Sequence, residues 1–188
     1  HTLTTNKATM MVRAQSRNGT RAPNEIRDLR GVLDQMRLTK DAHEIDTMRQ
    51  AADIASAGHV RAMRACRPGM AEYELEAELA YEFRRRGADG HAYTPIVAGG
   101  ANACILHYVD NNKLLAGHSL VLIDAGCEVS GYASDITRTF PVGGRFSPVQ
   151  REVYEIVLAA QQAAIAAVRP GAAFTDDHLA ARQVLAQG

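Results

Sequence analysis

The sequence predicts a mixed α and β domain built around a central antiparallel hairpin. Leu120–Ile123 is a short apolar run between Gly117 and Gly126, which is typical of a buried strand. After a polar break, Asp135, Thr137 and Thr139 alternate with Ile136, Arg138 and Phe140, as in a second strand. Apolar residues recur at helical spacing on both sides of this hairpin, so we expect helices before and after the sheet.

The composition is that of an ordinary globular domain. The 188 residues are 46% hydrophobic and 22% charged, which is enough for one core. Lys plus Arg equal Asp plus Glu at 21 each, so no basic field would attract nucleic acid or anionic lipid. No apolar stretch is long enough to span a bilayer. We therefore expect neither nucleic acid nor a membrane as a partner.

The cysteines indicate a reducing compartment. Cys66, Cys104 and Cys127 are odd in number, widely spaced and without a Cys-x-x-Cys pair. This pattern favours reduced core residues over a disulfide framework. The chain also opens without the charged, apolar and small-residue pattern of a secretion signal. We therefore expect a cytoplasmic protein.

The N-terminal residues show the weakest hydrophobic periodicity in the sequence. Residues 1–24 are polar, with little periodicity, as in a linker or a cut edge. A short helix is expected over Glu25–Gln35. We place a boundary after residue 35 and assign residues 36–188 to one domain.

Two helices are expected next. A capping-box pattern, Asp41-Ala42-His43-Glu44, opens the first, and Arg67-Pro68-Gly69 ends it. Its apolar positions are Ile45, Met48, Ala52, Ala55, His59 and Met63. The second helix is expected from Ala71 to Arg86, with Gly87 as its cap. Its apolar face consists of Leu75, Leu79 and Phe83. The methionines at 48, 63 and 70 are expected to fill gaps in the core.

Strand character returns in two short segments after these helices. The first is Tyr93-Thr94-Pro95-Ile96-Val97 and the second is Cys104-Ile105-Leu106-His107-Tyr108. His107 ends the second segment. From the residues alone, it can be a hydrogen-bonded structural histidine or a catalytic one.

The two aspartates of the central hairpin suggest a metal site. If the turn is centred between Val129 and Ser130, Asp124 and Asp135 face each other across the strands, with Cβ atoms roughly 5 Å apart. Facing carboxylates require a compensating cation or a shared proton. One or two divalent ions would meet that need, since carboxylates suit manganese, magnesium, cobalt or zinc. The alternative is a surface hairpin whose aspartates point at water.

A helix follows the hairpin, and its ending repeats an earlier one. Ser147-Pro148-Val149-Gln150 combines an N-cap serine with proline at the first helical position. The helix ends at Arg169-Pro170-Gly171, 102 positions after Arg67-Pro68-Gly69, and each time another helix is expected to follow. A single Arg-Pro-Gly is only a helix terminator, whereas the repeated order favours an internal duplication with two pseudo-symmetric halves.

The hairpin also carries a family resemblance. The segments Ile123–Gly126 and Gly131–Phe140 resemble the metal-binding hairpin of the pita-bread metallopeptidases, in the aminopeptidase P and prolidase branch. The similarity includes Ile105–Tyr108 and Arg67–Gly69 and runs from about residue 36 to the end. It implies an α+β pita-bread fold, in which a curved, mostly antiparallel sheet is backed by helices. The chain would hold its first half and the start of the second, with residues 1–35 as the tail of an N-terminal domain or a linker.

The resemblance also implies a chemistry. The family hydrolyses peptides with proline at the second position, using two divalent ions, manganese first and cobalt or zinc as alternatives. By position, Asp124 would hold one ion and Asp135 would bridge both. His107 would be the catalytic and substrate-binding histidine that stabilises the oxyanion, and Tyr93 would bind substrate near the metals.

The same resemblance limits what this chain is expected to do alone. The remaining family ligands, one histidine and two glutamates, belong to later strands, so we expect an inactive fragment with weak metal binding and exposed apolar surface, taken from a homo-oligomeric enzyme. Three alternatives remain. Prolidase would cleave only Xaa-Pro dipeptides, and a non-enzymatic pita-bread module would bind without cleaving. Creatinase-like relatives lack the metal ligands, so Asp124 and Asp135 argue against them.

Overall fold

The computed structural model describes residues 28–188 and divides into two compact units, with the boundary after Ala42. The described part of the first unit contains one helix, α2 (Arg30–Leu38), none of whose residues is buried. The helix predicted over Glu25–Gln35 therefore begins and ends later than expected. Residues 25–27 of that prediction, and the linker predicted over residues 1–24, lie outside the described residues.

Two helices open the second unit, as the sequence predicts. They are α3 (Ala42–Ala65) and α4 (Glu72–Arg85). On α4, the predicted apolar face is confirmed, because Leu75, Leu79 and Phe83 have no exposed surface. Together with the strands, the two helices form one hydrophobic core.

The buried face of α3 agrees with the prediction at Ala55 and His59 and differs from it elsewhere. Small residues line it: Ala51, Ala55, Gly58 and Ala62. A Cβ atom on Gly58 would lie 2.4 Å from the ring of Phe83, so this face lets α4 approach closely. The large residues that suggested another face, Ile45, Met48 and Met63, are 37–40% exposed. Of the three methionines expected to fill the core, only Met70 is buried.

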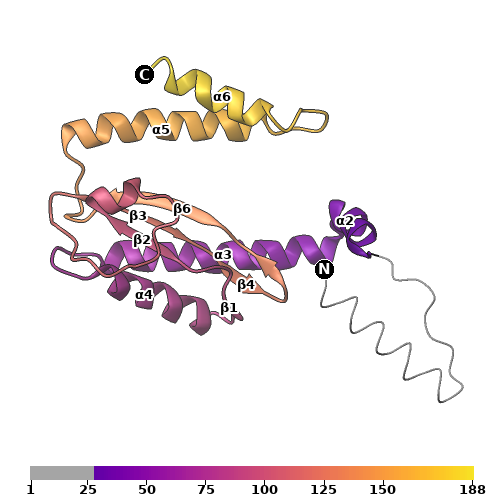
Figure 1. Ribbon diagram of the computed structural model, residues 1–188, viewed down its shortest axis with the longest axis horizontal. Coiled ribbons are helices and arrows are strands. Elements are labelled where there is room, and N and C mark those ends of the chain that lie inside the picture. Colours follow the sequence, from indigo (N-terminus) through magenta and orange to yellow (C-terminus); the bar gives the residue numbers. More distant parts are fainter. Residues whose placement is uncertain (1–27) are drawn as a thin grey trace, which may run out of the picture. The chain divides into compact units, whose positions relative to one another are not determined.

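Within residues 28–188, the strands form two antiparallel sheets, and Figure 1 labels most of these strands. One sheet has the order β1 (Gly90–His91), β4 (Cys127–Val129) and β5 (Tyr132–Ala133). The other has the order β2 (Ile96–Gly99), β3 (Leu120–Ala125) and β6 (Ile136–Pro141). Because β3 leads into β4 and β5 into β6, the two sheets share one long hairpin, which changes sheets at Gly126 and Ser134–Asp135.

The register of this hairpin corrects the prediction. The turn is centred on Ser130 and Gly131, whose φ angles of 49° and 83° suit a two-residue hairpin loop. Asp124 consequently pairs with Thr137 and not with Asp135. The predicted register was wrong by two residues, because it did not use the positive φ angles that such a turn requires. A two-residue slip keeps each side chain on the same face.

Gly126 fits a close crossing of the two arms of the hairpin. A Cβ atom at this position would lie 1.7 Å from the carbonyl oxygen of Ser134. The backbone nitrogen of Cys127 donates to Ser134 Oγ at 3.0 Å, and Ser134 Oγ donates to the carbonyl oxygen of Cys127 at 3.0 Å. The arms are therefore tied together between Asp124 and Asp135.

The predicted strand Cys104–Tyr108 is wrong. This region begins with a 3₁₀ helix, η1 (Gly100–Cys104), and continues as a turn in which His107 has a φ of 56°. Its exposure also corrects the expectation that all three cysteines are core residues, because Cys104 is exposed, Cys66 is half-buried and Cys127 is buried. All three are free thiols.

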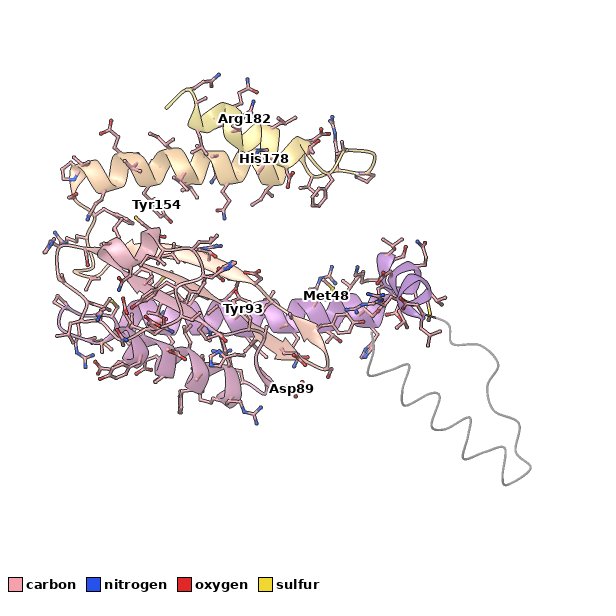
Figure 2. All side chains as sticks on the ribbon, viewed as in Figure 1. Met48, Asp89, Tyr93, Tyr154, His178 and Arg182 are labelled. Carbon is pink, nitrogen blue, oxygen red and sulfur yellow. The ribbon has the colours of Figure 1, made fainter. Side chains whose placement is uncertain are left out.

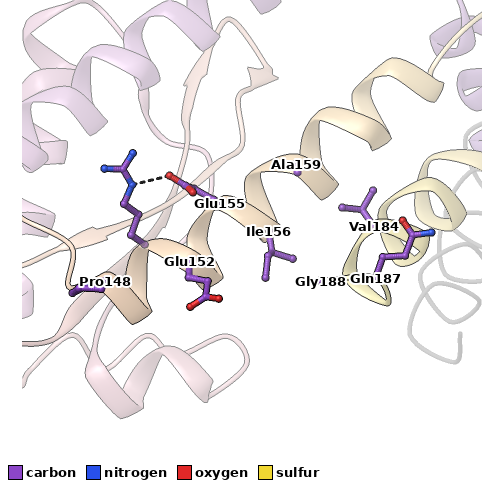
Figure 3. A pocket seen from close by; sticks show the side chains of 9 residues that line it. Pro148, Glu152, Glu155, Ile156, Ala159, Val184, Gln187 and Gly188 are labelled. Carbon is purple, nitrogen blue, oxygen red and sulfur yellow. Dashed lines mark hydrogen bonds and ion pairs between the residues drawn. The ribbon is translucent and has the colours of Figure 1, made fainter.

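The last two helices, α5 (Pro148–Ala167) and α6 (Asp176–Leu185), pack on each other. The predicted capping box is confirmed: Gln150 N donates to Ser147 Oγ at 3.2 Å, and Ser147 N donates to Gln150 Oε1 at 2.9 Å. A cavity of about 690 Å³ lies between the helices near Ile156 and Val184 (Figure 3). Within residues 28–188, no helix combines the length and apolar character needed to cross a membrane.

The Gly126 crossing can be tested by Gly126→Ala. Because the new methyl group would overlap backbone, we expect a loss of about 1–3 kcal/mol or more in the free energy of unfolding, measured by urea denaturation. Gly90→Ala is the matched control, since no atom lies within 4 Å of the Cβ position there. Equal losses in both variants would show that the crossing is not close.

A second stability prediction concerns Glu82, which is 3% exposed. Hydrogen bonds from Arg85 and Arg86 lower the pKa of Glu82 from 4.5 to about 2. The ionised Glu82 carboxylate therefore contributes to the free energy of unfolding above pH 4.5, and this contribution is lost as the pH falls towards 2. We expect Glu82→Gln to flatten the loss of stability over this pH range in acid titrations followed by circular dichroism. Glu155→Gln, in an exposed ion pair with Arg151, should leave the profile nearly unchanged.

Candidate metal centre

Tyr93 joins the two aspartates singled out by the sequence. It lies in the segment between β1 and β2 (Figure 2). Its hydroxyl group contacts Asp124 Oδ1 at 2.5 Å and Asp135 Oδ1 at 2.9 Å. Asp124 is half-buried near the end of β3, and Asp135 is exposed directly before β6. The carboxylates thus converge although they are not opposite partners in the hairpin.

The convergence leaves negative charge only partly compensated. A phenol has one proton, so it can fully satisfy one carboxylate or be shared between two. Burial raises the pKa of Tyr93, and the hydrogen bonds to the two carboxylates raise it further, so the hydroxyl keeps its proton. Two carboxylates sharing one donor proton form a site in which a cation would be stabilised.

The donor chemistry fits a hard or borderline divalent ion. Carboxylate oxygens suit magnesium, manganese, cobalt and zinc. In the described part of the chain, no group of three or more His, Cys, Asp or Glu side chains is placed to hold a metal. The described residues therefore offer two carboxylate ligands, fewer than the four or more that a tightly bound ion takes.

His59 supports the strand that carries Asp124. It is 2% exposed, and its Nε2 lies 3.0 Å from the carbonyl oxygen of Ala125. Burial lowers the pKa of His59, so the ring is neutral and donates through Nε2. Sequence periodicity placed His59 on a buried helix face but gave no sign of its partner, which lies 66 residues away.

His107 occupies a different setting. Its side chain is exposed, in the turn after η1, and its φ angle is positive. It takes no part in the hydrogen bonds that join Tyr93 to the aspartates. Of the four predicted site residues, the structure thus brings together Tyr93, Asp124 and Asp135, and it places His107 on an exposed turn.

Comparison with known proteins decides the family. Residues 46–188, most of the chain, match metallopeptidase family M24. The chain belongs to this family. It is 49% identical over 166 residues to the Xaa-Pro aminopeptidase of Escherichia coli K12, covering 88% of this chain and 38% of that protein. The Xaa-Pro aminopeptidase of Haemophilus influenzae is 53% identical over 148 residues, covering 79% of this chain and 34% of that protein.

Solved structures agree. Aminopeptidase PepP of Pseudomonas aeruginosa superimposes with a TM-score of 0.87 and 50% identity, covering 94% of this chain and 40% of that one. Zinc-substituted E. coli aminopeptidase P in complex with product superimposes with a TM-score of 0.88 and 44% identity, covering 97% and 42%. The pita-bread fold expected from the hairpin is confirmed. This M24 chain spans roughly two-fifths or less of the length of these relatives.

The role of the shared tyrosine can be tested in the metal-free chain. Tyr93→Phe removes the donor between two carboxylates, so the free energy of unfolding at neutral pH should fall by about 1–3 kcal/mol in urea denaturation. The loss should shrink when Asp124→Asn and Asp135→Asn are also present, because amides bring their own donors. Tyr73→Phe, at a 58% exposed position on α4, is the control. An equal loss from Tyr93→Phe in both backgrounds would contradict the shared hydrogen bond.

Proposed function

We propose that the protein to which these residues belong hydrolyses the peptide bond between an N-terminal residue and a proline at the second position. The observation that carries the proposal is the convergence of Asp124 and Asp135 on one tyrosine hydroxyl, within a family of metallopeptidases. Support for the substrate comes from the relatives at 49% and 53% identity, which are named Xaa-Pro aminopeptidases. Their names favour this activity over that of prolidase or a binding module.

Asp124 would hold one divalent ion, and Asp135 would be shared between two. Manganese is the proposed metal, with cobalt or zinc as alternatives, because carboxylate ligands suit all three. When bound, such ions supply Lewis acidity and a hydroxide nucleophile near neutral pH. The carboxylates hold the site at the end of β3, where the crossing at Gly126 and the hydrogen bond from His59 support the backbone.

The other two residues face the substrate in this proposal. His107 is exposed and so accessible to a peptide, and its ring would donate a hydrogen bond to the oxyanion that develops at the scissile carbonyl. Tyr93 keeps its proton and orients both carboxylates, and it would bind substrate beside them. The water proton must pass to the leaving proline nitrogen, and we assign no residue between 28 and 188 to that transfer.

Further proposals concern the setting. Two carboxylates alone bind a divalent ion weakly, so we expect hydrolysis only when additional ligands complete the site. The free thiols and the balanced charge support a cytoplasmic enzyme without nucleic-acid or membrane partners. We also propose that the complete enzyme is a homo-oligomer.

The proposal can be tested in a chimaera. This chain would replace the matching segment of the E. coli relative, and cleavage of Ala-Pro-Ala and of the dipeptide Ala-Pro would be measured with added Mn²⁺. We expect cleavage of the longer peptide, and a loss of at least about a hundredfold in kcat/KM with Asp124→Asn or Asp135→Asn. Asp53→Asn, an exposed position on α3, is the control.

A metal titration of the 188-residue chain complements this assay. Calorimetry with Mn²⁺ should show weak binding that either aspartate substitution removes and Asp53→Asn does not. A folded chimaera that cleaves neither peptide, or one whose activity survives both aspartate substitutions, would refute the proposed function. Cleavage of the dipeptide alone would assign prolidase activity instead.

A further inference from the structure

A buried carboxylate outside the metal centre binds four donors. Glu72, the first residue of α4, has no exposed surface. Its Oε1 accepts from Gly99 N at 2.8 Å and from Asn102 Nδ2 at 2.9 Å. Its Oε2 accepts from the Tyr108 hydroxyl at 2.8 Å and from Lys113 N at 3.0 Å. Both oxygens are thus saturated by groups from one stretch of chain.

That stretch, residues 99–113, is the one that carries His107. Gly99 and Lys113 are its two ends, and Tyr108 directly follows the histidine. The backbone is also tied at Lys113, whose carbonyl oxygen accepts from Glu72 N at 2.9 Å. Residues 100–113 belong to no strand ladder, and the bridge between Ala71 and Leu114 lies just beyond them. The segment is therefore held by the side-chain hydrogen bonds to Glu72 together with the backbone bond from Glu72 N to Lys113.

Glu72 is ionised although it is buried. Burial raises its pKa, but the hydrogen bonds from Gly99, Lys113, Asn102 and Tyr108 outweigh burial and lower the pKa overall, so the carboxylate is ionised. A buried carboxylate is tolerated when donors saturate its oxygens. Moving the segment would leave the Glu72 carboxylate exposed or without hydrogen-bond donors. This cost opposes movement of the segment.

The restraint by Glu72 acts next to an unfavourable backbone conformation at His107. A φ of 56° is unfavourable for a residue with a side chain and persists only when surrounding contacts enforce it. Tyr108 is 7% exposed and directed into the protein, whereas the adjacent His107 side chain is exposed. Anchoring Tyr108 on Glu72 therefore fixes the direction in which His107 points.

A second buried anchor works in parallel. Asn111, 3% exposed, accepts from Val97 N at 2.9 Å and donates to Pro95 O at 2.9 Å. It also donates to Glu76 Oε2 at 2.8 Å. Glu72 and Glu76 are one helical turn apart, so α4 reaches the segment at two places along the same face.

We propose that Glu72 is a positioning residue that fixes residues 99–113 and, through Tyr108, presents His107 to the substrate. The role of His107 rests on the proposed function, whereas the restraint by Glu72 stands on the contacts above. The substrate class is the same peptide with proline at the second position.

The test uses hydrogen exchange of the 188-residue chain, followed by NMR. Glu72→Gln replaces one acceptor oxygen by an NH₂ donor that faces other donors. We expect the amides of Gly99 and Lys113 to exchange at least about tenfold faster, while the β3 amides of Val121 and Ile123 keep their rates. Glu152→Gln, the same change at an exposed position on α5, should alter neither set.

Tyr108→Phe is the second variant, because it removes one hydroxyl group and leaves Glu72 with three donors. The His107 ring resonances should shift and broaden in both Glu72→Gln and Tyr108→Phe, and stay unchanged in Glu152→Gln. The positioning role would be overturned by uniformly faster amide exchange across the fold. It would also be overturned if the His107 resonances were the same in the wild type and in both variants.

A peptide titration separates this proposal from the proposed function. Ala-Pro-Ala added to the chimaera, in which the segment from the relative completes the site, should shift the His107 resonances, and Tyr108→Phe should weaken the response severalfold. If the resonances of a folded chimaera do not respond, the substrate role of His107 fails. The exchange comparison still decides whether Glu72 fixes the segment.

Discussion

The site depends on keeping two like charges close together. Asp124 and Asp135 belong to the two arms of one hairpin, and the backbone brings them together where the arms cross at Gly126. Repulsion between the carboxylates opposes this arrangement, and a single shared proton from Tyr93 offsets it only in part. The fold therefore holds an electrostatically unfavourable pair in place, which is what a cation site requires. The core beneath the hairpin provides the stability to do so.

Helix α4 serves both the core and the loop that carries His107. Its apolar face buries Leu75, Leu79 and Phe83 completely, while its first residue, Glu72, binds the segment around His107. Because the same helix packs in the core and binds the loop, it holds the loop in a defined position relative to the sheet. This arrangement explains how an exposed histidine with an unfavourable φ angle can have a defined position without lying in a strand.

The helix pairs α3–α4 and α5–α6 share the same order around Arg-Pro-Gly but differ in packing. The first pair contributes to the core with the sheet. The second pair packs mainly on itself, and apolar side chains such as Val153, Val157 and Ile165 are 54–65% exposed. The predicted exposure of apolar surface is therefore found in the second pair. The duplication stays a prediction. Among the described residues, only the first pair has a sheet to cover.

The sequence by itself determined helices α3 to α6, the strands of the hairpin and the family, because periodicity, caps and the hairpin motif are local signals. It predicted Asp124 and Asp135 from the hairpin and Tyr93 only through the family resemblance, and its strand over Cys104–Tyr108 was wrong. It did not determine the register, which depends on the φ angles at Ser130 and Gly131. It misplaced the core face of α3, where small residues, not large ones, make the contact with Phe83. Only the tertiary structure brought the hydroxyl of Tyr93 between two carboxylates and Glu72 to a loop up to 41 residues away. Hydrogen bonds between distant residues leave no periodic trace in a single sequence, so their partners are decided when the elements pack.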